Sequence, residues 1–390
     1  MNRVTILVTH LLGTGHLSRA ITLARACQSG GLATQLISGG MPVPHFDASG
    51  IDMLQLPPVR TDGAGFTNLL DRYGNRASAT LLAERTRLII DALQERRPDV
   101  FITELFPFGR RSLLAEFEAA LQAARNLSPP AVVLSSIRDI LEPQAKPIKA
   151  IETRERLLRF YDAVLVHSDP GFVPLEASWP VAEDVAEMLR YTGYMAPASV
   201  SGGAPGEDGK DEILVTAGGG PVGRRLFEMA IRAAREDGKR RWRLLVGGND
   251  VVELCRHLND TANGAPASAE PARKDYRDML TRCTAAVGQC GYNTAVDWMQ
   301  IGVPGVFVPF ADEKEVEQTQ RAQLLSRHYG YGLIAESDLT PTNLVDAVEA
   351  AIDRGRIHAE DANLDGGVGT VRILEQMLQA RCSNSNLHLS

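Results

Sequence analysis

Short apolar runs alternate with longer amphipathic segments along most of this chain, and many of these runs are rich in valine, isoleucine and leucine. In the first half we expect buried strands at residues 4–9, 34–38, 100–103, 132–136 and 163–167. Continuous apolar strands separated by helices are typical of a parallel sheet that helices cover on both faces. The alternation therefore predicts a doubly wound α/β fold.

The alternation stops at residues 196–211, where Gly, Pro, Ser and Asp dominate, and it restarts directly afterwards. A chain of 390 residues is also longer than one hydrophobic core usually serves. We expect an N-terminal Rossmann-like domain at 1–195, a linker at 196–211, a C-terminal Rossmann-like domain at 212–365, and a terminal helix and tail at 366–390. Three less regular segments are expected to be a surface loop, a solvated basic turn and a frayed tail, in this order: 259–271, 240–243 and 382–390.

The composition argues against several classes of protein. A formal net charge of −7 is unlike that of a surface made mainly for nucleic acid or anionic lipid. The five cysteines include no CxxC pair, which suits a reducing compartment and gives no zinc or disulfide framework. The first apolar run is too short for a signal peptide, and no run approaches the roughly 20 apolar residues that span a bilayer. We predict a cytoplasmic protein, and leave peripheral membrane contact through residues 137–148 open.

A glycine turn follows the first expected strand and leads into the first helix. It consists of Gly13, Thr14, Gly15 and His16. Glycines there let the backbone turn sharply and bring N–H groups close to a ligand. The Lys-Ser/Thr pair of a phosphate-binding P-loop is missing, and Ser18 stands where a dinucleotide-binding motif has its third glycine, which disfavours a nicotinamide-dependent dehydrogenase.

Two further glycine turns lie in the second half and predict a site for a nucleoside diphosphate. Gly218, Gly219 and Gly220 follow a strand and could form an anion-binding nest. The other turn follows the strand ending near residue 288 and opens a helix whose free N–H groups suit a diphosphate. Asp297 lies one helical turn further on, where its carboxylate could accept hydrogen bonds from both ribose hydroxyls. The candidate donor-binding residues around this second turn are Gln289, Gly291, Tyr292, Asn293 and Thr294.

Four polar side chains at strand ends of the first half are candidates for a general base. His16 is favoured because the glycine turn presents it and its ordinary pKa lies near working pH. Glu104 follows an expected strand and is the preferred acidic partner, while Asp139 and His167 occupy similar positions. No pair of aspartates stands at a strand end in the spacing of a metal-binding DxD motif, so we expect metal-independent chemistry.

The string from Gly13 to Ala20, GTGHLSRA, resembles the N-terminal loop of GT-B glycosyltransferases related to the N-acetylglucosaminyltransferase of lipid II synthesis. The second half repeats that family's order of a glycine-turn helix, a G-x-P strand, and the pairs Glu317-Gln318 and Arg321-Ala322. The stretch from Glu104 to Arg111, ELFPFGRR, resembles a group of predicted bacterial glycosyltransferases of uncertain substrate. The first loop looks equally like that of the nucleotide-sugar hydrolase of pseudaminic acid synthesis.

This resemblance implies a GT-B fold, two Rossmann-like domains facing a cleft, with a nucleotide sugar as co-substrate and no further cofactor. It also implies that Asp297 binds the ribose, that Glu317 and Gln318 bind the donor sugar, and that the loop around Tyr276 and Met279 meets the nucleobase. The family usually has Glu at the position of Asp297, and the lipid II branch usually has Gln at that of Glu317. These departures leave the sugar unassigned.

The leading interpretation is a glycosyltransferase that uses a UDP-linked sugar, inverts the anomeric centre, and takes a small-molecule, glycan or lipid-linked acceptor. A nucleotide-sugar hydrolase or epimerase on the same scaffold is the alternative, with water in place of the acceptor. A carbohydrate- or nucleotide-binding regulator without activity is the third. The long first half favours a transferase, because water needs no large acceptor domain.

Overall fold

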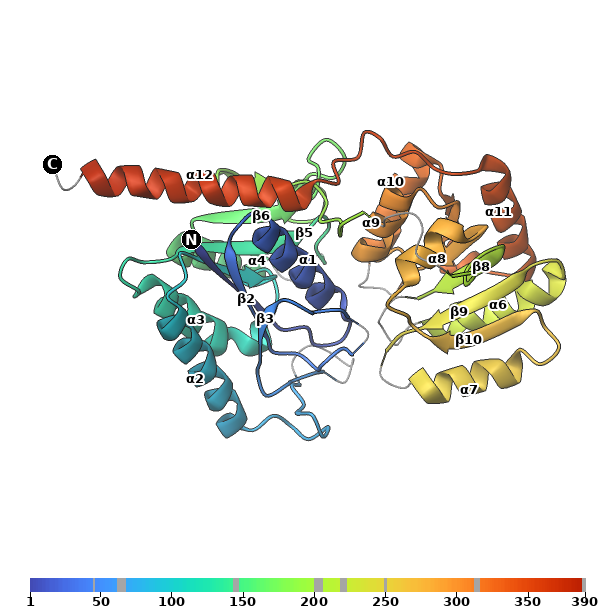
Figure 1. Cartoon of the computed structure of the whole chain (residues 1–390), viewed down its shortest axis with the longest axis horizontal. Coiled ribbons are helices and arrows are strands. Elements are labelled where there is room, and N and C mark those ends of the chain that lie inside the picture. The colour runs from blue at the N-terminus through green and yellow to red at the C-terminus, as the bar shows by residue number, and fades with distance from the viewer. Residues whose placement is uncertain are drawn as a thin grey trace. The chain divides into compact units, whose positions relative to one another are not determined.

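The computed structural model describes residues 1–44, 46–61, 68–142, 147–199, 206–217, 223–248, 251–311 and 316–387. It divides into two compact units (Figure 1). The first comprises Met1–Pro44, Ala48–Met195 and Asn363–Ser390, and the second comprises His45–Asp47 and Ala196–Ala362. Each unit has its own buried apolar core around its own sheet.

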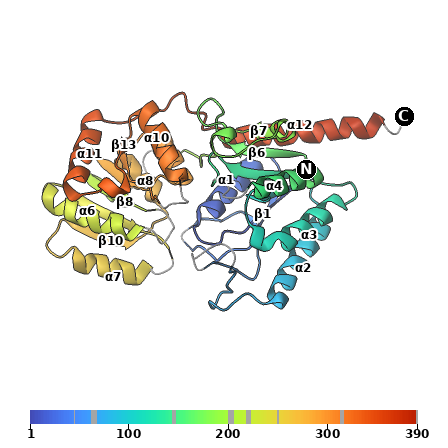
Figure 2. The same ribbon diagram turned by 180° about the vertical axis from the view of Figure 1, so that it is seen from behind.

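The first unit is built on a seven-stranded, wholly parallel sheet in the order β3-β2-β1-β4-β5-β6-β7. Its central strands are buried along almost their whole length, because helices cover both faces (Figures 1 and 2). The strands are β1 (Arg3–Val8), β2 (Ala33–Ser38), β3 (Asp52–Gln55), β4 (Val100–Glu104), β5 (Val132–Arg138), β6 (Ala163–His167) and β7 (Leu189–Tyr191). The helices are α1 (Gly15–Ser29), α2 (Ala79–Arg96), α3 (Leu114–Arg125), α4 (Ile148–Phe160) and α5 (Glu183–Ala186), with short 3₁₀ turns at Arg111–Leu113 and Leu175–Ala177.

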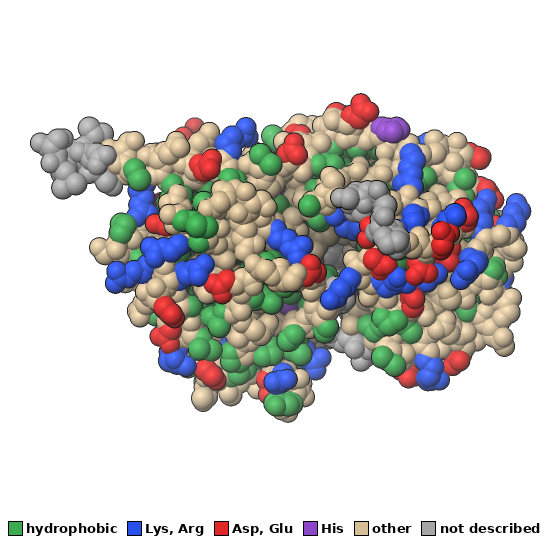
Figure 3. Space-filling model, viewed as in Figure 1, with side chains coloured by type: hydrophobic (Ala, Val, Ile, Leu, Met, Phe, Trp, Pro, Cys, Tyr) green, Lys and Arg blue, Asp and Glu red, His purple; other side chains and the backbone are tan. Residues whose placement is uncertain are grey.

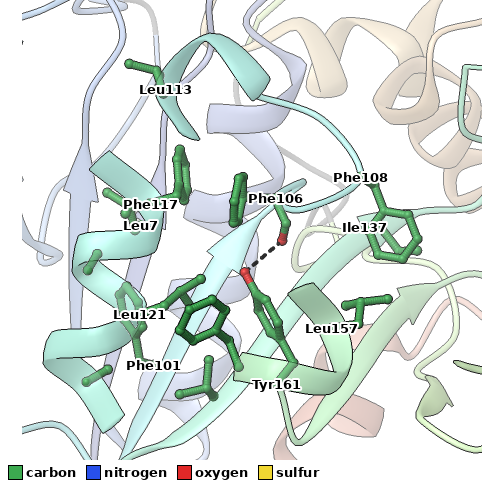
Figure 4. Close-up of a cluster of buried hydrophobic side chains, with 14 of the residues drawn as sticks. Leu7, Phe101, Phe106, Phe108, Leu113, Phe117, Leu121, Ile137, Leu157 and Tyr161 are labelled. Carbon is green, nitrogen blue, oxygen red and sulfur yellow. Dashed lines mark hydrogen bonds between the residues drawn. The ribbon is translucent and has the colours of Figure 1, made fainter. Parts of the chain in front are cut away.

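The turn between β4 and α3 is held in place by its own backbone carbonyl and by aromatic packing. The carbonyl of Phe106 accepts hydrogen bonds from the hydroxyls of Thr103 (3.0 Å), Ser135 (2.8 Å) and Tyr161 (3.1 Å), the last of which is drawn in Figure 4. The Phe106 ring stacks on Phe117 with the ring centres 4.7 Å apart. These contacts fix the course of the chain immediately after the Glu104 strand.

The last helix of the chain, α12 (Gly366–Leu387), belongs to the first unit and packs against α1. Small residues allow this close approach: a Cβ on Gly30 would come within 2.6 Å of Val371, and one on Gly367 within 2.9 Å of Ala26. The helix also includes residues 382–387, so the expectation of a frayed tail is wrong for these residues, and residues 388–390 lie outside the described part of the chain.

The second unit repeats the plan with a six-stranded parallel sheet in the order β10-β9-β8-β11-β12-β13. Counted from its own first strand, this is the 3-2-1-4-5-6 order of nucleotide-binding α/β folds. Its strands are β8 (Glu212–Thr216), β9 (Arg241–Val246), β10 (Ala267–Pro271), β11 (Ala285–Gly288), β12 (Gly305–Phe307) and β13 (Gly332–Leu333). Its helices are α6 (Arg224–Asp237), α7 (Val251–Thr261), α8 (Tyr276–Arg282), α9 (Tyr292–Ile301), α10 (Glu317–Tyr329) and α11 (Pro341–Arg354), with a 3₁₀ turn at Glu336–Asp338.

The Trp298 ring fixes how α9 sits on this sheet. The ring stacks on Phe307 with the centres 4.4 Å apart. It lies so close to the strands that a Cβ on Gly305 would come within 2.5 Å of it and one on Gly288 within 3.1 Å. Glycine in β11 and β12 therefore lets α9 begin directly beside the sheet.

Two segment predictions in the second unit were wrong. Residues 259–271 hold the end of α7 and the strand β10, which lies at the edge of the sheet and so lacks a continuous apolar run. The basic run 240–243 is not a solvated turn, because Arg243 lies within β9 and its side chain is 12% exposed. It contacts the carboxylates of Glu212 (2.6 Å) and Glu270 (2.9 Å). Acidic and basic side chains also lie interspersed over the face of the molecule drawn in Figure 3.

The predicted doubly wound α/β class, two parallel-sheet units with alternating helices, is confirmed.

Candidate functional site

Three polar side chains meet at the carboxyl ends of β4, β5 and β6. Two of them, Glu104 and His167, are candidates from the sequence, and the third is Ser136. Glu104 closes β4 and pairs in register with Ser136 of β5, while His167 closes β6. All three side chains are buried, and the glycine turn after β1 adds His16 at the start of α1. Parallel strands end at one edge of their sheet, which explains why residues 88 positions apart in the chain meet here.

His16 and Glu104 form the central pair of this cluster. Nδ1 of His16 lies 3.0 Å from Oε1 of Glu104. Burial alone would raise the pKa of Glu104, but the charge of Arg19 and the hydrogen bonds from His16 and Ser136 outweigh it and lower that pKa to about 2. Nδ1 also lies 3.2 Å from Nη2 of Arg19, but the ionised Glu104 carboxylate can only accept and is the nearer group, so we assign the hydrogen of the neutral His16 ring to Nδ1. This tautomer leaves Nε2 with a lone pair.

The pKa of His16 is held well below its ordinary value, first by burial and then by the positive charge of Arg110. Glu104 opposes both effects through its hydrogen bond and its charge. His16 is consequently neutral at physiological pH, which is the state that a general base requires.

A line of hydrogen bonds continues from Glu104 away from His16. The Ser136 hydroxyl donates to Oε2 of Glu104 (2.6 Å) and lies 3.0 Å from Nε2 of His167. Nδ1 of His167 lies 2.9 Å from the Thr192 hydroxyl, just past β7. Because both ring nitrogens of His167 already contact protein groups, His167 supports the cluster and offers no nitrogen for a substrate proton.

Arg19 is the member of the cluster that the sequence analysis gave no role. It lies one turn into α1 after His16, is 2% exposed, and donates to the same Glu104 oxygen that His16 contacts. The i, i+3 spacing of His16 and Arg19 on one helix face was the available signal. Its charge is the main reason that Glu104 stays ionised.

Asp139, the third predicted catalytic residue, lies just beyond β5 and is fully buried. Its carboxylate accepts a hydrogen bond from the Ile140 backbone N–H at 2.8 Å. The described contacts that reach His16 run through Glu104 and Arg19. Gly13, Thr14 and Gly15 form the turn itself, with Thr14 at the N-cap of α1 and no atom within 4 Å of a Cβ built on Gly13.

In the second unit, the predicted diphosphate turn lies between β11 and α9. Gly291 is the N-cap of α9 with extended backbone (φ −65°, ψ 155°), so the helix begins at Tyr292. Gln289 and Tyr292 are buried, whereas Asn293 and Thr294 are partly exposed in the first turn of the helix. A helix start of this kind presents backbone N–H groups and the positive end of the helix dipole. Gly218, Gly219 and Gly220, the other predicted turn, lie outside the described residues.

Asp297 lies on α9 facing Arg277 of α8. The Arg277 Nε and Asp297 Oδ1 are 2.9 Å apart, but their orientation is not that of a hydrogen bond. Burial raises the pKa of Asp297 to about 6, although the Arg277 charge acts in the opposite direction. A carboxylate oxygen such as Oδ1, buried and without a hydrogen-bond partner among the described residues, is suited to accept hydrogen bonds from the hydroxyls of a ligand.

α10 connects the predicted sugar-binding pair to the α9 turn through Arg321. Oε1 of Glu317 accepts a hydrogen bond from Nη2 of Arg321 (2.7 Å), and Nη1 of Arg321 donates to the Cys290 carbonyl (2.7 Å). Oε1 of Gln318 accepts from the Phe310 backbone N–H at 3.2 Å. In the sequence, Arg321 stands out only by its spacing from Glu317 and Gln318, whereas in the structure its side chain joins α10 to the turn.

Tyr276, expected near the nucleobase, begins α8, and its hydroxyl accepts a hydrogen bond from Nε1 of Trp298 at 3.0 Å. This contact joins the start of α8 to the helix that carries Asp297. Tyr276 thus has a defined position beside α9 within the same unit.

Within the described ranges, no group of three or more His, Cys, Asp or Glu side chains is arranged to hold a metal ion. Among the helices of the described chain, none combines the length and the apolar character that crossing a membrane requires.

The second unit matches a known family of protein domains. Residues 218–364 match the model of the glycosyltransferase family 28 C-terminal domain. The chain is 27% identical over 208 residues to the UDP-N-acetylglucosamine–N-acetylmuramyl-(pentapeptide) pyrophosphoryl-undecaprenol N-acetylglucosamine transferase of Lactiplantibacillus plantarum. That alignment covers 51% of this chain and 55% of the relative, so it spans little more than half of that enzyme.

Two solved structures extend the likeness in fold to nearly the whole chain. MurG of Acinetobacter baumannii has a TM-score of 0.58 at 14% identity and covers 96% of this chain and 100% of its own. The glycosyltransferase VinC, solved in complex with dTDP, has a TM-score of 0.57 at 16% identity and covers 96% of each chain. Both likenesses concern the fold, and they extend it beyond the part that the family model matches.

Proposed function

Because this chain belongs to the GT-B superfamily and is related to the N-acetylglucosaminyltransferases of lipid II synthesis, we propose that it is a glycosyltransferase. It moves a sugar from a nucleotide-sugar donor, UDP-linked and with inversion, to an acceptor hydroxyl. The observation that carries this proposal is the buried His16–Glu104 pair: a neutral imidazole beside an ionised carboxylate.

In the proposed mechanism, Nε2 of His16 removes the proton from the acceptor hydroxyl as that oxygen attacks the anomeric carbon. The ring then carries a positive charge, which the Glu104 carboxylate stabilises at 3.0 Å through the Nδ1 hydrogen. Arg19 and Ser136 keep Glu104 ionised and in place, so the carboxylate does not take up the proton itself. Asp139 remains a candidate supporting acid rather than the preferred partner.

We propose that the second unit binds the donor. The first turn of α9, from Gly291 to Thr294, accommodates the diphosphate, whose leaving charge the helix dipole stabilises without a metal. The Asp297 carboxylate accepts hydrogen bonds from the ribose hydroxyls, and the side chains of Glu317 and Gln318 bind the donor sugar. Arg321 holds the two groups of residues in a fixed arrangement by joining α10 to the Cys290 carbonyl.

A panel of nucleotide sugars, incubated with and without candidate acceptors, tests the proposal. We expect nucleotide release that depends on an acceptor, persists in EDTA, and yields the inverted anomer by NMR. Release without any acceptor would indicate the hydrolase or epimerase alternative, and absence of both release and UDP binding would refute the enzymatic proposals together. Activity lost in EDTA and restored by magnesium or manganese would contradict the metal-free mechanism.

We also propose a cytoplasmic location for the protein, with an acceptor that is lipid-linked or soluble. Cell fractionation tests the location: recovery in the cytosol or as a salt-released membrane fraction agrees with it, and recovery outside the cell contradicts it.

A further inference from the structure

The anchored turn after β4 presents one side chain in an unusual way. Arg110 ends this turn with left-handed backbone (φ 62°, ψ 29°) and precedes the 3₁₀ turn Arg111–Leu113. Left-handed backbone is unfavourable for every residue with a Cβ, and glycine would adopt it without strain. The neighbouring glycine, Gly109, is not the residue placed there. Leu105 in the same turn is also left-handed (φ 69°), but its side chain packs against the apolar core, whereas Arg110 places a charged group there.

One donor of the half-buried Arg110 guanidinium has no acceptor among the described residues. Its Nε atom is buried and has no hydrogen-bond partner among the described residues. The acid whose charge acts on it most strongly is Glu104, while Arg138 and Arg19 oppose it with positive charge. Glu104 is already occupied by Arg19, His16 and Ser136. A buried donor without a partner is costly, and an anion would satisfy it.

Arg110 also stands close enough to His16 for its charge to be the second largest influence on that histidine, after burial. The groups that act electrostatically on His16 are Glu104, Arg19 and Arg110. An anion on Arg110 would offset the positive charge that weakens His16 as a base. Binding of an anionic molecule would thereby strengthen the base at the moment when it is needed.

We propose that Arg110 binds an acid group, a phosphate or a carboxylate, carried by the acceptor near its reacting hydroxyl. The anion site follows from the turn, the left-handed backbone of Arg110 and its unpaired Nε atom. The assignment of the anion to the acceptor rests on the proposed function.

The test measures the thermal unfolding midpoint of the full chain against inorganic phosphate and, separately, acetate. Ionic strength is held constant with chloride, and saturating UDP occupies the second unit. The dissociation constant follows from the rise in the midpoint. We expect wild type to be stabilised by at least one of the two anions, and the stronger one identifies the acid group as phosphate or carboxylate.

Three substitutions at the same position separate charge from fold. Arg110→Gln should weaken anion binding by about tenfold or more, because a charge-assisted hydrogen bond is lost. Arg110→Gly should lose the same response while unfolding at an equal or higher temperature without anion, because glycine relieves the backbone strain. Arg110→Lys should retain part of the response. The matched control is Arg87→Gln on the exposed face of α2, where Arg87 pairs with Asp91 in solvent.

An unchanged anion response in Arg110→Gln and Arg110→Gly would overturn the site, as would the absence of any response in wild type. A loss of UDP affinity in Arg110→Gln as large as the loss of anion affinity would show that Arg110 serves the donor, which refutes the acceptor assignment. If wild type turns over no nucleotide sugar but its anion response still disappears in Arg110→Gln, the proposed function fails and the anion site stands.

Discussion

The charge of Asp297 should make the second unit less stable as the pH rises. Its folded pKa is about 6, against an ordinary value of 3.8, because burial disfavours the ionised carboxylate. The folded state therefore favours the protonated form relative to the unfolded state. The stability that protonated Asp297 contributes is fully present below about pH 4, and it is lost as the pH rises through about 6. A shift of this size corresponds to about 3 kcal/mol in the free energy of unfolding.

Asp297→Asn should remove this pH dependence. The amide keeps the shape of the side chain without the charge, and Arg277 retains its 2.7 Å hydrogen bond to the Ala198 carbonyl. We expect the variant and its parent to be similar in stability near pH 4. At pH 7 the variant should be more stable by up to about 3 kcal/mol.

Urea unfolding followed by tryptophan fluorescence measures this difference in the second unit alone if Trp179 is replaced by phenylalanine. The two remaining tryptophans, Trp242 and Trp298, both belong to the second unit. The control is Asp260→Asn, because the Asp260 side chain is 68% exposed and should show no such pH dependence. A stability difference between Asp297→Asn and its parent that stays constant from pH 4 to pH 8 would refute the reasoning.

Three further substitutions test other parts of the structure. His16→Ala should lower turnover by about 10²-fold or more with UDP affinity unchanged, which nucleotide release and a UDP titration measure; near-normal turnover would remove His16 from the mechanism. Ser136→Ala removes a 2.6 Å hydrogen bond to Glu104, so turnover should fall by roughly tenfold and the acidic limb of the pH–rate profile should move upward, whereas an unmoved profile would mean that the bond is only structural. Gly305→Ala places a Cβ within 2.5 Å of Trp298 and should destabilise the second unit by about 1–3 kcal/mol in the same fluorescence assay; unchanged stability would mean that the helix can shift freely.

The strands that are buried on both faces of the sheet could be predicted, because each is a continuous run of apolar residues in the sequence. The central strands β1, β4, β5 and β6 all fall at expected positions. Edge strands are covered on one side only, so their sequences alternate or contain polar residues, and β3 and β10 were missed for this reason. A local sequence pattern indicates whether a segment is buried. It does not reveal an edge strand, because such a strand forms by pairing with a strand that is distant in the sequence.

Only some residues of the candidate site could likewise be selected from the sequence. Side chains that follow a strand, such as His16 and Glu104, could be selected because strand ends mark where ligands bind in this class of fold. Their partners were harder to select: the spacing of Arg19 from His16 and the position of Arg321 in its motif gave no role to either residue, and Ser136 lies within a strand where no local pattern distinguishes it. What brings them into contact is strand register and helix packing, and neither is encoded locally.

The return of the chain to its first unit in α12 has a consequence for biosynthesis. The ribosome makes residues 196–362 before the segment that packs against α1, which delays completion of the first unit by about ten seconds or more. During that interval the α1 surface that receives Val371 is uncovered, and at its end all residues of the second unit have been made. The unit begun first is thus the one finished last, and the nascent chain carries a complete second unit beside an open first one.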